Sequence, residues 1–484
     1  MMMVIGNHIY ISMKRTIIIL FIILTLAGCV SVGPDYRKPE IALPSQWNQT
    51  LVSSATASNL DIKILATWWS KLNDPALSSL IDRAILGNLD LREAKARVRE
   101  ARAQRGVSVA DQFPSVDATA SASRNRTSGG VQNLYSAGFD ASWELDLFGG
   151  KRRSVEAAQG TLEASEEDLR DVLVTLVAEV ALNYVDVRAY QTRLGIAEAN
   201  RDAQQETYQI TQWRLEGGLI TALDVEQARY SLEQTRSQIP PLQTSLEKSK
   251  NRLALLLGKH PGSLEEELSE RKFIPVAPVE IAVGIPADVL RNRPDVRRAE
   301  RKLAAQTAKI GVAAAELYPK LALNGSIGFE ALSARSLFTY GNRVYGFGPS
   351  ITWNIFDAGR IRKNIAVQSA LQEQALIQYE AAILSALEGV NNALVAYVQE
   401  QIHRQTLNEA KSAAQRAVEL ARSRYESGLV DFQVVLDAQR SLLTFQDSLA
   451  VSEAEVTADL IRLYKALGGG WTPMSEVNVK SEPS

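Results

Sequence analysis

Hydrophobic residues recur every seven positions in two separate parts of the chain. The first series is Val225, Leu232, Ile239, Leu246 and Leu253, and the second is Val435, Leu442, Leu449, Val456 and Leu463. Each residue of the first series lies 210 positions before its counterpart in the second. A seven-residue repeat places one apolar stripe along a helix and is typical of helices that pack as coiled coils. The pattern predicts two matching helices and an internally duplicated chain.

The duplication extends beyond these two helices. Residues 90–118 align without a gap with residues 295–323, and the Phe113-Pro114 pair falls on Tyr318-Pro319. From Trp143 and Trp353 onward the offset is 210. Two unrelated helices can share a composition but would hardly share this register, so we interpret the chain as two copies of one unit.

Both copies have the same predicted order of elements: an opening helix, two strands, a long helix and a return helix. The opening helices are predicted over 74–112 and 288–317, the strands over 113–127, 133–147, 318–330 and 344–356, and the long helices over 151–216 and 361–426. Each opening helix ends at an aromatic residue followed by proline, which pushes the preceding residue toward extended geometry. The return helices end at Gly258 and Gly468. Pro240-Pro241 predicts a kink in the first of them.

The predicted strands alternate small polar with apolar residues, as in residues 116–122 and 321–329, and aromatic residues such as Phe139, Trp143 and Trp353 lie near their ends. This alternation is typical of a transmembrane β-barrel, but a half-buried soluble sheet gives the same pattern. Four strands cannot close a barrel, and an open edge in lipid costs several kcal/mol for each unpaired backbone group. Strands that enter a membrane must therefore be pooled from several chains.

The N-terminus has the three-part plan of a secretory signal peptide over residues 1–28. Lys14-Arg15 precede an apolar run over residues 17–26, which is about half of the ~20 residues that a membrane-spanning helix needs; a signal anchor is the alternative. Met13 opens this plan, so we predict that it is the true start or that residues 1–12 are dispensable. Residues 26–29, Leu-Ala-Gly-Cys, resemble the bacterial lipobox. The resemblance implies S-diacylglycerol and N-palmitoyl chains on Cys29 and, because Val30 is not Asp, export to the outer membrane.

The composition argues against an enzyme and against nucleic-acid binding. The chain has 1 Cys and 3 His. One Cys is too few for a disulfide framework or a thiolate metal site, and three scattered His argue against a histidine metal site or a Ser-His-Asp triad. Lys and Arg total 53 against 55 Asp and Glu, so no basic footprint for nucleic acid is present. Carboxylate groups such as Glu166-Glu167 are interpreted as solvated surface. We therefore predict no cofactor other than the lipid on Cys29.

Five motifs resemble those of one family. They are SWELDLFGGKRR (142–153), PADVLRNRPDVRRAE (286–300), IPPL (239–242), LLG (256–258), and RYESGLV with VLDAQRSLL (424–443). Over roughly residues 29–470 the chain resembles the TolC-like outer-membrane factors, in the lipoprotein branch of OprM-type and NodT-type efflux components. The resemblance implies a mostly α fold with a membrane β-barrel. It implies a homotrimer with a 12-stranded β-barrel continuous with a 12-helix α-barrel tunnel.

The resemblance also implies a function. The chain would be the passive exit duct of a tripartite efflux pump in the outer membrane of a Gram-negative bacterium, extending into the periplasm. A periplasmic membrane-fusion adaptor would join it to a proton-driven, RND-type inner-membrane transporter. Ducts for type I protein secretion or metal-ion efflux remain alternatives, as does a lipid-anchored periplasmic coiled-coil scaffold. Because Met474 is the one methionine of the predicted mature chain, a wall of soft-metal ligands is not expected.

The duplication divides the chain into predicted segments. These are the signal peptide (1–28), a lipidated N-terminal segment (29–73), repeat 1 (74–258), an equatorial linker (259–287), repeat 2 (288–468) and a C-terminal tail (469–484). Each repeat contains one helical hairpin.

The turns of the two hairpins are predicted to dock the adaptor. Gly217, Gly218 and Gly428 permit a tight turn. Leu219 and Leu429 are apolar residues at the apex of the turns. The alternative is that each leucine is buried within its own hairpin. Because an apolar residue at the end of a helical rod is hard to bury there, we favour a docking surface.

A charge difference between the copies predicts a gate. Asp437 and Arg440 lie three residues apart on one helix face, where the first copy has Gln227 and Tyr230. Such a pair is ordinarily a surface pair worth ~0.2–0.5 kcal/mol. In a trimer, however, Asp437 would form a ring of three carboxylates, and Arg440 would offset their repulsion. The resemblance to OprM-like ducts also places the constriction of the periplasmic entrance here. Tyr425 and Asp431 are further candidates for this gate.

Overall fold

The structure is a computed structural model that describes residues 31–41, 44, 55–56, 65–127, 130–275, 281–282, 289–290 and 293–471. The predicted signal peptide, Cys29 and nearly all of the C-terminal tail lie outside the described residues. The chain divides into two compact units. The strand-bearing unit comprises residues 1–40, 97–166 and 298–380, and the hairpin unit comprises residues 41–96, 167–297 and 381–484.

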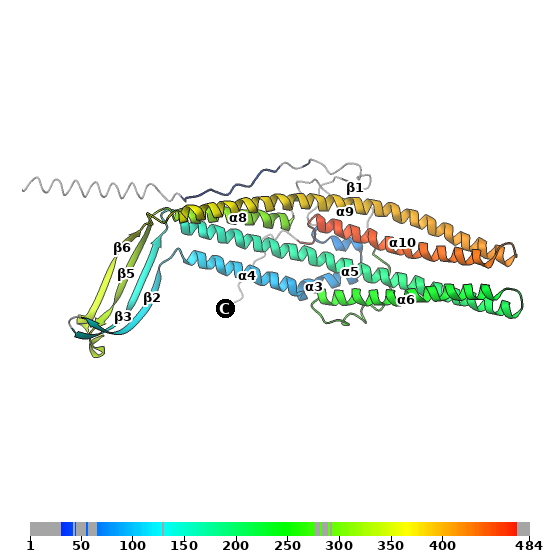
Figure 1. The fold of residues 1–484 in the computed structure, drawn as a ribbon, viewed down its shortest axis with the longest axis horizontal. Coiled ribbons are helices and arrows are strands. Elements are labelled where there is room, and N and C mark those ends of the chain that lie inside the picture. The colour runs from blue at the N-terminus through cyan, green and yellow to red at the C-terminus, as the bar shows by residue number, and fades with distance from the viewer. Residues whose placement is uncertain are drawn as a thin grey trace, which may run out of the picture. The chain divides into compact units, whose positions relative to one another are not determined.

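The strand-bearing unit contains an antiparallel sheet in the order β2-β3-β5-β6 (Figure 1). The strands are β2 (Ser115–Thr127), β3 (Gly130–Leu145), β5 (Lys320–Ala331) and β6 (Arg343–Thr352), which confirms the four predicted strands. β6 ends earlier than predicted because the residues after it lead into a helix cap. The carboxylate of Asp357 accepts hydrogen bonds from the N–H groups of Gly359 (2.9 Å) and Ile361 (2.8 Å).

The two faces of this sheet differ in chemistry. One face carries exposed apolar side chains from all four strands: Val116, Phe139, Leu323, Ile327, Phe347 and Ile351, with the half-buried Trp143 on the same face. The other face carries polar side chains that hydrogen-bond across strands, including Thr119 to Asp140 (2.8 Å) and Ser142 to Asn324 (3.0 Å). A soluble half-buried sheet hides its apolar face, whereas here both faces are exposed within the chain.

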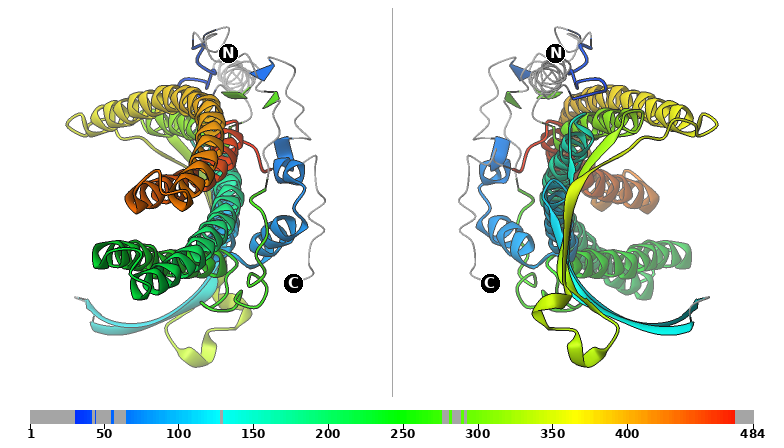
Figure 2. Two further views of the ribbon diagram at one scale, coloured as in Figure 1. Left: turned by 90° about the vertical axis from the view of Figure 1, so that its right-hand side faces the viewer. Right: turned by 90° about the vertical axis from the view of Figure 1, so that its left-hand side faces the viewer.

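The sheet is curved, as Figure 2 shows. Two facing glycines allow its strands to approach closely at one point. Gly138 pairs with Gly328 on the polar face. A Cβ atom added to Gly138 would lie 2.9 Å from the Cα of Gly328, and one added to Gly328 would lie 2.8 Å from the Cα of Gly138. Since real Cβ atoms do not approach so closely, this point of the sheet requires glycine on both strands.

Corresponding long and return helices of the two copies have equal lengths, as the duplication predicts. α5 (Gly150–Glu216) and α9 (Arg360–Glu426) each have 67 residues, and α6 (Ala222–Leu256) and α10 (Phe432–Ala466) each have 35. The long and return helices of each copy form a hairpin (Figure 1). α6 is continuous through Pro240 and Pro241, so the predicted kink remains a prediction.

The first opening helix is not continuous as predicted. It is divided into α3 (Pro75–Gly87) and α4 (Leu89–Ala110), and Asn88 separates them. The Asn88 side chain accepts a hydrogen bond from the N–H of Leu91 (2.9 Å) and donates one to the carbonyl of Leu256 (2.9 Å). The prediction of one helix is wrong because this side chain caps α4 and ties the break to the end of α6.

The second opening helix is also shorter than predicted. α8 (Pro294–Ala315) begins at Pro294, which is suited to the first turn of a helix, and Asp295 supplies the acidic residue there. Residues 289–290 are helical too, but Arg293 is not, and residues 291–292 lie outside the described part of the chain. The remaining short elements are β1 (Ala55–Thr56), β4 (Ile281–Ala282), η2 (Trp68–Leu72), η3 (Ala334–Ser336) and η4 (Tyr340–Asn342). β1 and β4 pair in parallel.

The heptad residues supply the core of the hairpin unit. Leu232, Leu253 and Leu463 are each at most 1% exposed, which confirms the predicted apolar stripes. At the end of the return helices, Trp68 of η2 stacks on Tyr464 of α10 with 5.3 Å between ring centroids. The chain segment before the first repeat therefore packs against the last helix of the second.

One described helix, α9, contains an 18-residue window apolar enough to cross a membrane by length and composition. Its mean hydropathy is 1.4, and 28% of the window is buried. A single such helix is weak evidence for a membrane span, because a helix that packs against partners passes the same test.

Candidate functional site

The two hairpin turns have the same backbone structure. Gly218 and Gly428 adopt left-handed φ values of 72° and 71°, which glycine permits without steric cost. The N–H of Leu219 donates to the carbonyl of Arg214 (2.8 Å), and that of Leu429 donates to Arg424 (2.9 Å). These bonds close each long helix in the manner of a Schellman motif. Gly217 corresponds to Ser427, so that position does not require glycine.

The leucines at the two turns are exposed. Leu219 and Leu429 are both 73% exposed. The alternative that each leucine is buried in its own hairpin is therefore excluded within one chain. Docking of a partner on them remains a prediction.

The turns differ in how the return helix begins. In the first copy the side chain of Asp224 accepts hydrogen bonds from the backbone N–H (2.9 Å) and hydroxyl (2.8 Å) of Thr221, as part of a capping box. In the second copy Asp431 occupies the N-cap position, and its side chain makes no capping hydrogen bond within the described part of the chain. Asp431 thus presents an exposed carboxylate beside the turn.

The structure brings Asp437 and Arg440 together on α10. The Oδ1 atom of Asp437 accepts from Nη1 of Arg440 (3.1 Å) and from Nε2 of Gln433 (2.9 Å). Both members of the ion pair remain partly exposed. The guanidinium of Arg440 also lies 5.9 Å from the ring centroid of Tyr230, its counterpart in the first copy. Arg440 therefore links the two return helices, and Gln433 is a site residue that the sequence analysis missed.

Tyr425 makes no hydrogen bond through its hydroxyl to Asp437 within the described part of one chain. Its ring lies 5.2 Å from that of Phe432, and the guanidinium of Arg214 lies 5.1 Å from its centroid. Its hydroxyl is buried and has no hydrogen-bond partner among the described residues. An unpartnered buried hydroxyl is costly, so this atom has the capacity to bond to a second chain.

A hollow of about 680 Å³ lies between α5, α6 and α10. Arg440 and Asp447, which are seven residues apart on α10, both line it. Asp447 accepts two hydrogen bonds from Arg193 of α5, at 2.7 and 3.0 Å. This ion pair could not be predicted from the sequence because its members are far apart along the chain. The hollow is thus lined by the Arg193–Asp447 ion pair and by Arg440, whose partner Asp437 is not part of the lining.

The first described residues, 31–38, form a strap on the strand-bearing unit. The N–H of Val32 donates to the carbonyl of Phe148 (3.1 Å), directly after β3. The nearly buried guanidinium of Arg153 donates to Asp35 (2.6 Å) and to the carbonyl of Val32 (3.2 Å). The chain next to Cys29 is therefore tied to the junction between the sheet and α5.

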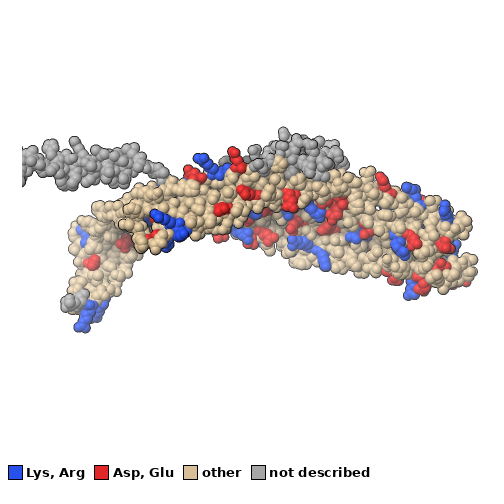
Figure 3. Space-filling view, turned by 45° about the horizontal axis from the view of Figure 1, so that its top comes forward, with Lys and Arg blue, Asp and Glu red and all other residues tan. Residues whose placement is uncertain are grey.

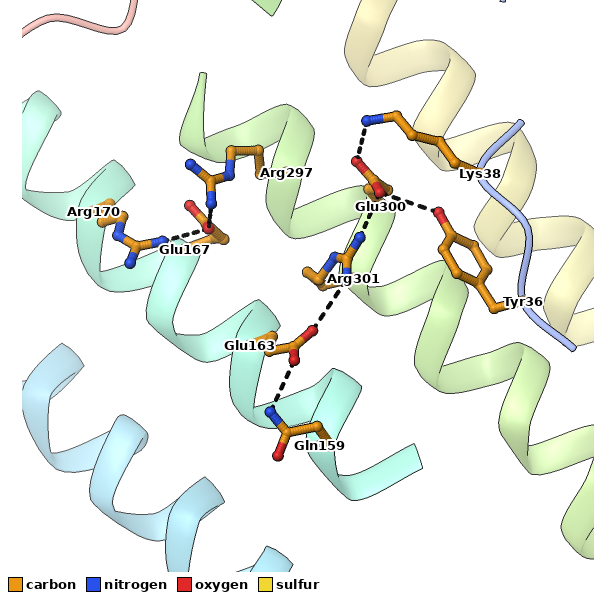
Figure 4. A network of polar contacts seen from close by, with 9 residues as sticks. All are labelled: Tyr36, Lys38, Gln159, Glu163, Glu167, Arg170, Arg297, Glu300 and Arg301. Atoms are coloured by element: carbon orange, nitrogen blue, oxygen red, sulfur yellow. Dashed lines mark hydrogen bonds and ion pairs between the residues drawn. The ribbon is translucent and has the colours of Figure 1, made fainter. Parts of the chain in front are cut away.

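Glu300 of α8 holds the other end of the strap, as Figure 4 shows. Its carboxylate accepts hydrogen bonds from Nζ of Lys38 (2.8 Å), the hydroxyl of Tyr36 (3.3 Å) and Arg301 (2.5 Å). Burial by itself would raise the pKa of Glu300, but the hydrogen bonds from Lys38 and Arg301 outweigh it and lower the pKa below its usual value.

Replacing Glu300 with glutamine should release the strap. The charged hydrogen bonds from Lys38 and Tyr36 would be weakened by about 1.5 kcal/mol, so we expect protease cleavage within residues 31–40 to be roughly tenfold faster. Because folding lowers the pKa of Glu300, its contribution is present at neutral pH and is lost as the pH falls through the folded pKa. Cleavage of the natural chain should therefore accelerate in acid, and cleavage of Glu300→Gln should not. Equal rates for both proteins, with Glu166→Gln as the control, would contradict this.

Comparison with known proteins gives one consistent match. The family model described as "Outer membrane efflux protein" matches residues 80–259 and again residues 285–469, which confirms the duplication. "Nodulation protein T" of Rhizobium leguminosarum bv. trifolii is 33% identical and the match covers 95% of this chain and 98% of the relative. "Cation efflux system protein CusC" of Escherichia coli is 34% identical, over 93% and 97% of the two chains.

The solved structures give the same fold. The structure described as that of "the outer-membrane channel OprN" has 36% sequence identity and a TM-score of 0.86, covering 92% of this chain and 100% of that one.

Proposed function

The chain belongs to the outer membrane efflux protein family, and on this basis we propose that three copies assemble into one exit duct across the outer membrane. As a member of the family it is an outer-membrane efflux channel, and it is a transport protein, not an enzyme. Its fold is TolC-like, mostly helical with a four-stranded sheet.

The observation that carries the assembly is the sheet with two exposed faces and two free edges. β2 and β6 are the edges, and each would leave a row of backbone groups unpaired in lipid. Pairing β6 of one chain with β2 of the next removes every edge, and three chains give a 12-stranded barrel. The apolar face would then contact lipid, and the polar face would line the lumen.

The helices support the same assembly. α9 exposes Val367, Leu371, Ile377, Leu384, Val395 and Ile402 within one chain. Neighbouring chains of a trimer would cover such a surface. The four long and return helices of each chain, with the opening helices stacked on the return helices, then form a 12-helix tunnel in the periplasm.

The partners follow from this role. Cys29 would carry the lipid that anchors the chain to the outer membrane, next to the strap. The hairpin turns would meet a periplasmic membrane-fusion adaptor, which connects to a proton-driven, RND-type inner-membrane transporter. Drugs and other small molecules are the proposed cargo. The name of the relative from Escherichia coli favours metal ions as a second candidate cargo.

Cross-linking tests the assembly. Ser121→Cys on β2 with Gly348→Cys on β6 should form disulfides between chains and give a covalent trimer on denaturing gels. Ser136→Cys with Glu330→Cys, which face each other within one sheet, should bond only within a chain. The same purified protein should form cation-conducting channels in planar bilayers. A monomer without conductance would favour the lipid-anchored scaffold instead.

A further inference from the structure

Four arginines lie at the end of the sheet where β2 leads to β3 and β5 leads to β6. They are Arg124, Arg126, Arg335 and Arg343, all of them exposed. None forms an ion pair within the described part of the chain. One acidic residue, Glu330, lies at this end, and it pairs with Ser136 on the polar face. The end of the sheet therefore carries uncompensated positive charge, which is visible as blue side chains in Figure 3.

Three of these arginines belong to the apolar face of the sheet. Arg124 and Arg126 continue the alternate positions of β2 that begin at Val116, and Arg126 pairs with Val131 of β3. Arg343 pairs with Phe329 of β5, on the same face. Side chains of a strand alternate between faces, so this assignment follows from the register. These three arginines thus lie at one end of the apolar surface that the proposed function places against lipid.

The fourth arginine, Arg335, lies in the loop between β5 and β6, which is held in shape by its own hydrogen bonds. Asn342 donates hydrogen bonds to the carbonyl of Ser336 (2.6 Å) and to the hydroxyl of Thr339 (3.0 Å). The guanidinium of Arg343 lies 3.3 Å from the ring centroid of Tyr340. Phe338 packs edge-on against Phe329 with 5.5 Å between centroids and stays 73% exposed. The loop therefore presents aromatic rings beside the arginines.

The strap identifies which side of the membrane this end faces. It contacts Phe148, beyond the opposite end of β3, and Cys29 precedes the strap by two residues. A lipid on Cys29 would enter the inner leaflet. The 12 residues of β5 span roughly 40 Å, which a strand tilt of ~40° reduces to about the 30 Å of the hydrocarbon core. The arginines then lie at the surface of the outer leaflet.

We propose that this end of the sheet binds the phosphate groups of an anionic glycolipid of the outer leaflet, with its acyl chains along the apolar face. The inference rests on the proposed function, because it needs the apolar face to contact lipid. Guanidinium groups bind phosphate bidentately, and the exposed rings suit the membrane interface. Arginine on the lipid-facing side costs ~2–4 kcal/mol at the bilayer midplane but little near the interface, where phosphate compensates it.

Lipid binding by purified protein in neutral detergent tests the proposal. The probes are bisphosphorylated lipid A, the same lipid without phosphates, and inorganic phosphate. The variant carries Arg124→Gln, Arg126→Gln, Arg335→Gln and Arg343→Gln, and we expect its affinity for lipid A to fall at least about tenfold. A matched control replaces four arginines of the hairpin unit with glutamine (the exposed Arg229, Arg236 and Arg252 and the half-buried Arg201) and should bind as the natural chain does. The corresponding four Arg→Lys changes should retain most of the binding.

Each result of this experiment either supports or overturns the proposed lipid site. Unchanged affinity of the glutamine variant, or equal binding of lipid with and without phosphates, would overturn the proposal. Competition by millimolar inorganic phosphate would show a site for the free ion and would also overturn it. Trimer migration and conductance are measured on the same samples. If the natural chain binds lipid A but forms no channel, the proposed function fails and the lipid site stands as a property of the sheet alone.

Discussion

Replacing Asp437 and Arg440 together with alanine should raise the single-channel conductance of the assembled trimer by at least about twofold and lower its cation selectivity. Cells that carry the variant should become more permeable to bulky antibiotics. In the proposed trimer, the three Asp437 carboxylates would surround the axis near the hairpin turns. Their repulsion would be offset by Arg440, and cations would be favoured when the entrance opens.

Within the single chain, Asp437 and Arg440 each keep an atom that is able to form a further hydrogen bond. Asp437 receives its two bonds on one oxygen, Oδ1, and the buried Nε atom of Arg440 has no partner among the described residues. The pair is therefore able to bond to a neighbouring chain without losing its internal contact. Removing both residues also avoids leaving one charge without its partner.

The first copy offers a matched control for this measurement. Glu226 and Arg229 form an exposed pair on α6 with the same three-residue spacing and an N–O distance of 3.8 Å. Their double alanine variant should leave conductance and selectivity unchanged. If the Asp437 and Arg440 variant also behaves as the natural channel, in a trimer of normal migration, the two residues are a surface pair and the constriction lies elsewhere.

The repeating elements could be predicted because their signals are local or periodic. The heptad residues fix the return helices, and the offset of 210 residues transfers the boundaries of the long and return helices from one copy to the other. The Asp437–Arg440 pair was also predictable, since helix geometry brings residues three apart together.

Contacts between distant segments could not be predicted. The break at Asn88 depends on the carbonyl of Leu256, which is remote in sequence. The strap depends on Arg153 and Glu300, which lie in the motifs at 142–153 and 286–300, but nothing local in either motif identifies the partner of these residues. Tyr425 was predicted as a gate residue from its place in the long helix just before the turn, whereas its packing against Phe432 and Arg214 could not be foreseen. A periodic pattern predicts which face of a helix is buried, but it does not predict which segment of the chain packs against that face.

Replacing Leu219 and Leu429 with aspartate should abolish co-purification of the channel with its adaptor and leave the trimer intact. Both leucines are largely exposed, so their loss removes little buried surface from the chain. The turns should persist, because Gly218 and Gly428 supply their left-handed geometry and the closing hydrogen bonds use backbone atoms that aspartate retains.

The control variant should separate docking from a general effect of charge. Leu86 and Leu255 are also exposed leucines of the hairpin unit, at 81% and 55%, and lie away from the turns along the chain. Their aspartate variants should still bind the adaptor. Pull-down with trimer migration on gels measures both properties at once. Retained binding by the Leu219 and Leu429 variant would place the adaptor on the sides of the hairpins, because a charged apex would then be compatible with the complex.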